Sequence, residues 1–162
     1  MHVLVLNSGS SSIKFQLFDM GDGEQLPVKG MADKIRLEDS FLRSESPNGA
    51  SERRPMDLPD HRSALQAVFE ALSRLEEPCD AADIVFTAGI GENSPYLRGE
   101  ILRPFGYLGL RVDEARNQQG QTVFSSDDSR VRAMRVPTNE ELVIARDTCT
   151  LITGRVLASE GR

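Results

Sequence analysis

The chain changes hydrophobic period along its length. Residues 3–6 form a continuous apolar run, which is typical of a strand buried on both faces. Over residues 13–17 apolar and polar positions alternate, which indicates a second strand with one more exposed face. Because only a short Gly/Ser loop separates the two runs, they are predicted to form a β-hairpin.

The middle of the chain has a weaker pattern. Residues 21–60 contain many glycines and prolines among mixed charges, and only short strands such as Ser40–Ser44 are predicted there. From residue 61 the apolar positions recur at helical spacing. This period predicts an amphipathic helix over 61–75 that ends before Pro78.

The next segment predicts a strand followed by a helix. Residues 83–88 are apolar and strand-like. Ser94 followed by Pro95 is a favourable N-cap and first helical residue, so a helix is predicted to begin there and to end at Pro104 and Gly106.

The last segment predicts another strand and helix. Residues 132–136 are predicted as a short strand, and Thr138 and Glu141 have the spacing of a capping box. The helix that follows would carry one apolar stripe formed by Leu142, Ala145, Cys149, Ile152 and Val156. A hairpin followed by strand–helix alternation predicts an α/β fold, a mixed sheet with flanking helices.

Composition narrows the class of protein. The 162 residues suit one domain of ordinary size, and no apolar run is long enough to span a membrane. A net charge of −6 argues against a general nucleic-acid binder, but not against a nucleotide ligand. No export signal is recognised and Cys79 and Cys149 lack metal-ligand spacing, so we expect reduced thiols and a cytoplasmic location.

The hairpin loop NSGSSSIK has the composition of a phosphate-binding loop. It lacks the GK[ST] of a Walker loop and is followed by strand period, so it is not a P-loop. Small residues still let backbone N–H groups approach phosphate oxygens, while the hydroxyls of Ser10 and Ser12 add donors and Lys14 adds a charge. The alternative is a plain tight turn, for which Gly, Asn and Ser are ordinary residues.

Two later motifs are also candidates for ligand binding. In TAGIGENS, residues 87–94, glycines between a buried strand and a capped helix would place N–H groups beside a ligand, or would merely relieve crowding in a turn. In PTNEE, Glu140 is left free of the predicted cap and could face a magnesium ion, although a surface glutamate is the common alternative.

Taken in order, these motifs resemble the acetate/propionate/butyrate kinase family. The resemblance is carried by VLVLNSGSSSIKFQLFD, DHRSALQAVFEAL, IVFTAGIGENSPYLRGEIL, FGYLGLRVDEARN and RVPTNEELVIARDT, which cover nearly all of the chain. It implies the actin/sugar kinase/Hsp70-like (ribonuclease H-like) fold, in which two domains close around ATP. It further implies transfer of a phosphoryl group from ATP to acetate, giving acetyl phosphate and ADP, with Mg²⁺, usually in a homodimer.

The resemblance also implies roles for individual residues. Asn7 and Glu140 match the magnesium-associated positions, and Lys14 matches a nucleotide-binding lysine in the phosphate hairpin. The segment that lines the adenosine pocket is matched by Gly89, Ile90, Gly91, Glu92 and Asn93.

The departure from the family is a large internal segment that this chain lacks. Residues 76–82 are expected to be a junction between 1–75, the amino-terminal part of the first kinase domain, and 83–131, a remnant of the second. Residues 132–162 would complete the first domain. The resemblance implies that the lost part held the acetate pocket, the arginines, a histidine and a catalytic aspartate, so no catalytic residue is assigned here.

Three interpretations follow. The chain is an acetate kinase homologue that is inactive or crippled by itself, a noncatalytic module that binds nucleotide or pairs with a kinase subunit, or a nonfunctional remnant. Without the missing region, the apolar residues Ile84, Phe86, Leu97 and Phe105 are expected to be exposed unless they repack or meet a partner.

Overall fold

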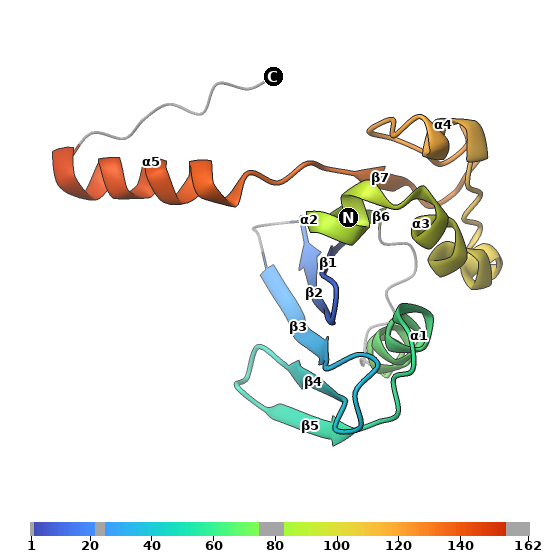
Figure 1. The fold of residues 1–162 in the computed structure, drawn as a ribbon, viewed down its shortest axis with the longest axis horizontal. Coiled ribbons are helices and arrows are strands. Elements are labelled where there is room, and N and C mark those ends of the chain that lie inside the picture. The colour runs from blue at the N-terminus through green and yellow to red at the C-terminus, as the bar shows by residue number, and fades with distance from the viewer. Residues whose placement is uncertain (1, 22–24, 75–82, 155–162) are drawn as a thin grey trace.

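The protein is built on one mixed sheet. The computed structural model describes residues 2–21, 25–74 and 83–154. Their strands have the order β5-β4-β3-β2-β1-β6-β7 (Figure 1). The strands are β1 (His2–Ser8), β2 (Ser12–Asp19), β3 (Gln25–Asp33), β4 (Phe41–Glu45), β5 (Ser51–Pro55), β6 (Asp83–Thr87) and β7 (Ala133–Arg135). This arrangement confirms the predicted mixed sheet with flanking helices.

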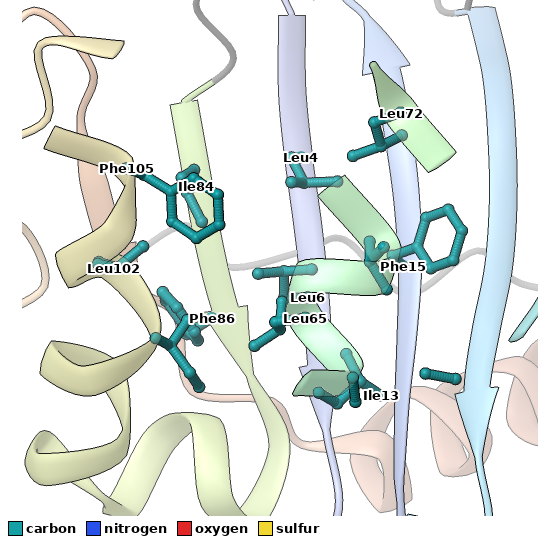
Figure 2. Close-up of a cluster of buried hydrophobic side chains, with 14 of the residues drawn as sticks. Leu4, Leu6, Ile13, Phe15, Leu65, Leu72, Ile84, Phe86, Leu102 and Phe105 are labelled. Atoms are coloured by element: carbon teal, nitrogen blue, oxygen red, sulfur yellow. The ribbon is translucent and has the colours of Figure 1, made fainter. Parts of the chain in front are cut away.

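Strand β1 joins the antiparallel and the parallel parts of the sheet. It pairs antiparallel with β2, as the predicted hairpin requires, and parallel with β6, which in turn is parallel with β7. Leu4 and Leu6 of β1 are buried on the same face as Ile84 and Phe86 of β6. Figure 2 shows these side chains and those of β2 gathered in one cluster.

Helices cover that buried face. The helix α1 (His61–Leu72) buries Leu65, Val68 and Leu72, whereas α3 (Pro95–Leu102) and the 3-10 helix η1 (Arg103–Leu108) add Leu102 and Phe105. A short helix, α4 (Glu114–Gln118), packs beside α3. The predicted starts of these two helices are confirmed, because α1 follows the cap Asp60 and α3 begins at Pro95 after the cap Ser94. Their predicted ends differ, since α1 ends at Leu72 and the 3-10 helix η1 continues α3 through Pro104 and Gly106.

Of the two expected outcomes for the apolar residues of the 83–131 segment, exposure or repacking, the structure shows repacking. Ile84, Phe86 and Phe105 are buried in the common core, and Leu97 is partly buried against it. The reason is the parallel pairing of β6 with β1, which gives this segment apolar neighbours from the first half of the chain. The assignment of 1–75, 83–131 and 132–162 to two kinase domains stays a prediction, and the junction 76–82 lies outside the described residues.

The sequence pattern did not predict strand β3, because its glycine and proline are residues typical of turns. It is nine residues long and includes Pro27 and Gly30. A Cβ atom at Gly30 would lie 2.3 Å from the carbonyl oxygen of Arg43 and 2.4 Å from Cζ of Phe15. Glycine is therefore present because the Phe15 ring packs directly over the β3 backbone, and the residue marks close packing rather than a turn.

The carboxy-terminal elements form as predicted, but with a different cap. The helix α5 (Glu140–Thr153) is capped by Asn139, whose side chain accepts a hydrogen bond from the N–H of Leu142 at 2.9 Å. The Thr138–Glu141 capping box is therefore wrong, since Thr138 bonds to another element. In the predicted stripe, Leu142 and Ile152 are exposed, while Val156 lies outside the described residues. Figure 1 shows α5 projecting away from the sheet.

We expect Gly30→Ala to lower the free energy of unfolding by about 1–3 kcal/mol, because the new methyl group overlaps backbone and ring atoms that cannot both move away. Urea unfolding measures the change. Gly106→Ala is the matched control, because no atom lies within 4 Å of its Cβ position, and it should stay within roughly 0.5 kcal/mol. Equal stability of the two variants would contradict the packing described here.

Candidate functional site

The first part of the site lies on the hairpin. Asn7 of β1 and Lys14 of β2 face each other across the strand pair, and both line a depression of about 350 Å³ in the sheet. Lys29 of β3 and Arg43 of β4 line the same depression. Glu45 lines it too and pairs with Lys29 at 3.2 Å, so Lys14 and Arg43 are the cations that would face an anionic ligand.

The hairpin loop is held by bonds to distant residues. Nε2 of the buried His61 lies 2.8 Å from the carbonyl oxygen of Gly9, and the N–H of Gly9 donates to the carbonyl of Ser12 at 2.9 Å. The N–H of Ile35 donates to the carbonyl of Ser11 at 2.9 Å. Sequence reasoning placed His61 only at the start of a helix. No pattern in the sequence indicates that it contacts a loop 52 residues earlier.

The second part of the site is a short helix directly after β6. The motif GIGEN, expected as the connection between a strand and a helix, forms the six-residue helix α2 (Ala88–Asn93). Gly91 is buried, and a Cβ atom there would lie 3.5 Å from Cβ of Ser8 at the end of β1. Since Asn7 and Thr87 are also register partners, α2 begins beside the end of β1.

The buried Arg98 donates hydrogen bonds to the backbone of α2. Arg98 of α3 is 1% exposed, and its guanidinium donates to the carbonyls of Gly91 and Glu92 at 2.9 and 2.7 Å. It also donates to the side chain and the carbonyl of the fully buried Asn117 at 2.9 and 3.0 Å. Burial, with repulsion from Arg135, lowers the pKa of Arg98. This network fixes the GIGEN backbone, and removing the guanidinium would leave several buried acceptors unpaired.

A glutamate joins α2 to the start of the last helix. Oε1 of Glu92 accepts hydrogen bonds from the N–H of Ala88 at 2.9 Å and from the N–H and hydroxyl of Thr138, both at 2.7 Å. Partial burial opposes ionisation, but these bonds together outweigh it and hold the pKa of Glu92 below its ordinary value. Ala88 has a left-handed φ of 62°, which this bond to Glu92 helps to maintain.

The predicted site residues therefore fall into two neighbouring groups. Asn7 and Lys14 share the depression, with Ser10 exposed and Ser12 half-buried in the adjoining loop. The residues Gly89, Ile90, Gly91, Glu92 and Asn93 form α2. Glu140 begins α5, and its side chain lies outside what the structure describes. Ligand contacts by these residues stay predictions.

The described residues were compared with the patterns of a metal site and of a membrane-spanning helix. Its His, Cys, Asp and Glu side chains form no group of three that could hold a metal ion. A magnesium ion that takes only one or two protein oxygens besides phosphate and water does not need such a group. Among the same residues, no helix is long and apolar enough to cross a membrane.

Glu92→Gln should make the free energy of unfolding depend less on pH in the acidic range. The fold lowers the pKa of Glu92, so its contribution is present above the ordinary value of 4.5 and is lost as the pH falls through the lower folded-state pKa. We expect the variant to be less stable than wild type near pH 7 and the gap to shrink below pH 4.5 in urea unfolding. The exposed Glu70→Gln is the control, and an equal, pH-independent loss in both variants would refute the bridge to Thr138.

Curated relatives of this chain are acetate kinases. The chain is 53% identical over 132 residues to one from Symbiobacterium thermophilum, and 50% identical over 130 residues to one from Heliobacterium modesticaldum. Each match covers 80% of this chain and 31% of the relative. A match to the acetate kinase of Pseudothermotoga lettingae is 52% identical over 71 residues, 43% of this chain and 18% of that protein. The chain thus spans less than a third of these relatives.

Solved structures give weaker matches. An acetate kinase from Entamoeba histolytica matches with a TM-score of 0.45 at 15% identity, covering 85% of this chain and 34% of that one. An acetate kinase from Porphyromonas gingivalis matches with a TM-score of 0.42 at 14% identity, covering 94% of this chain and 100% of that one.

The family assignment rests on sequence. A family model described as the Acetokinase family matches residues 2–84 and 71–146, which together span both groups of site residues. With the hairpin motif and GIGEN brought side by side on β1 and β6, and with relatives about half identical over most of its length, this chain belongs to the acetokinase family.

Proposed function

We propose that this chain keeps the phosphate-binding part of an acetate kinase nucleotide site and binds ADP or ATP with Mg²⁺, but does not complete phosphoryl transfer to acetate by itself. The observation that carries the proposal is the cross-strand pair Asn7–Lys14, which lines one depression on strands β1 to β4. The relatives that share these motifs are named acetate kinases.

The residues of the depression suit a polyphosphate. The Lys14 ammonium would act as a point charge on phosphate oxygens, and the Arg43 guanidinium on the same depression would add a second cation. Asn7 offers an amide oxygen, and Glu140 is proposed as the second magnesium-associated residue. When bound, Mg²⁺ would neutralise part of the phosphate charge.

The acid co-substrate has no proposed site here. In-line transfer spreads charge over the equatorial oxygens of the phosphoryl group, and catalysis depends on cations that are positioned around it. The resemblance implies that the arginines, histidine and aspartate that do this, together with the pocket for acetate or another short carboxylate, belong to the part of the family that this chain lacks. A cytoplasmic location and a homodimer are further proposals from the resemblance.

We expect no hydroxamate above the protein-free control when the purified chain is incubated with ATP, Mg²⁺, acetate and hydroxylamine. The physical reason is that positioned cations on the acyl side are missing. A full-length acetate kinase is the positive control. Turnover close to that of the full-length enzyme would overturn the proposal that transfer is lost.

Mg²⁺·ADP should raise the melting temperature of the chain, because a ligand that binds only the native state stabilises it. At 100 times the dissociation constant the stabilisation is about 2.7 kcal/mol, or a shift of roughly 5–10 °C for a chain of this size. Differential scanning calorimetry measures the shift.

The matched variants for this experiment each remove one positive charge. Lys14→Gln should abolish most of the shift, whereas Arg111→Gln, which removes an exposed charge paired with Asp128, should leave it unchanged. If ADP produces no shift in the wild-type protein at millimolar concentration, nucleotide binding is excluded and the chain is a remnant in this respect.

A further inference from the structure

A small pocket lies on the face of the sheet that α1 covers, where this helix contacts β3 and β4 (Figure 1). Leu42 of β4 is buried on that face, and its register partner Arg54 of β5 lines the pocket together with Ala71 of α1. Arg43 and Arg53 alternate with these residues along the two strands, and Arg43 lines the depression on the opposite face. The sheet therefore separates this pocket from the proposed nucleotide site.

Most polar groups of the pocket are hydrogen-bond donors. Arg54 and Arg74 bring two guanidinium groups, and Ser44 and Ser46 bring two hydroxyls. Among the described residues that line the pocket, Glu52 is the only carboxylate. Two positive charges and one negative leave an excess of one positive charge here, in a chain whose net charge is −6. A local excess of cations and donors suits an anion.

The two arginines lack acceptors within the described part of the chain. Nε of Arg54 is buried and makes no hydrogen bond there. None of the ion pairs between described residues includes Arg54 or Arg74. Among the same residues, no carbonyl at the end of α1 accepts a hydrogen bond from either side chain, so helix capping does not explain them. A buried N–H without an acceptor costs free energy, and an anion between the two guanidinium groups would supply the acceptor.

The size of the pocket selects a small anion. Its volume is about 150 Å³, whereas pockets for drug-sized ligands begin at about 300 Å³. A nucleotide is therefore too large, while a single phosphate or sulfate ion fits. The donors come from β4, the turn after it, β5 and the end of α1, so they approach the space from several elements. Donors that converge in this way match the oxygens of a tetrahedral ion.

We propose that this pocket binds a small tetrahedral oxyanion, held by the guanidinium groups of Arg54 and Arg74 and by the hydroxyls of Ser44 and Ser46. Glu52 repels the ion from the exposed side of the pocket and limits the affinity. The proposal goes beyond the proposed nucleotide site and does not depend on it, so it is tested with inorganic phosphate in the absence of nucleotide.

The test is a titration of the 162-residue chain with inorganic phosphate, followed by ¹H–¹⁵N NMR at constant pH and at an ionic strength held constant with chloride. Phosphate should give saturable shifts of the Ser44 and Ser46 amides and of the Arg54 Nε–H. Arg54→Gln and Arg74→Gln should each weaken the phosphate affinity about 10-fold or more, because each removes a charge-assisted hydrogen bond. Glu52→Gln should strengthen it about 2- to 5-fold, because it removes a repulsive charge at a solvent-exposed position.

Two control variants separate this pocket from other phosphate sites. Arg53→Gln, one residue away on the opposite face, and Lys14→Gln in the depression should both leave the shifts unchanged. Arg74 is exposed, so its Gln variant should keep the wild-type spectrum elsewhere and cannot act by unfolding the chain. The proposal is overturned if phosphate gives no saturable shift at these residues, or if both Arg54→Gln and Arg74→Gln leave the affinity unchanged. Loss of the shifts in Lys14→Gln would assign the phosphate to the depression and would overturn it too.

Discussion

The parallel pairing of β6 with β1 is the interaction on which the rest of the structure depends. It joins residues separated by about 80 positions, with Leu4 beside Ile84, Leu6 beside Phe86 and Asn7 beside Thr87. Because side chains alternate along both strands, one register buries the first two pairs under α1 and α3 and leaves the third at the strand ends. The core and the candidate site are thus consequences of the same register.

Once β6 lies beside β1, the position of GIGEN is determined. Helix α2 follows β6 without a loop, and Gly91 meets Ser8 because both lie at the carboxyl ends of parallel neighbours. In sheets of this kind, ligands bind at the carboxyl ends of the strands. Arg98, Asn117 and Glu92 then hold the short helix through its carbonyls and its carboxylate. Breaking any of these buried hydrogen bonds would leave a polar group unpaired, which costs free energy. The network therefore restrains the backbone of this motif.

Helix α5 lies outside this network. Glu92 bonds to Thr138 just before the start of the helix, and none of the described side chains of α5 is buried. In the described part of the chain, the core lies on the face of the sheet that α1 covers, while Leu151 and Ile152 of α5 are exposed.

The sequence by itself determined the local elements and the family. The hairpin, α1, α3 with its Ser94 cap, β6 and β7 follow from periods and caps that act over a few residues. What only the tertiary structure decided depends on contacts between distant residues. Gly30 belongs to a strand because the Phe15 ring packs over it, His61 holds the Gly9 carbonyl, and Thr138 bonds to Glu92 instead of capping α5. Ile84 and Phe86 are buried because a strand 80 residues away accepts them, and hydrophobic spacing carries no information about such a partner.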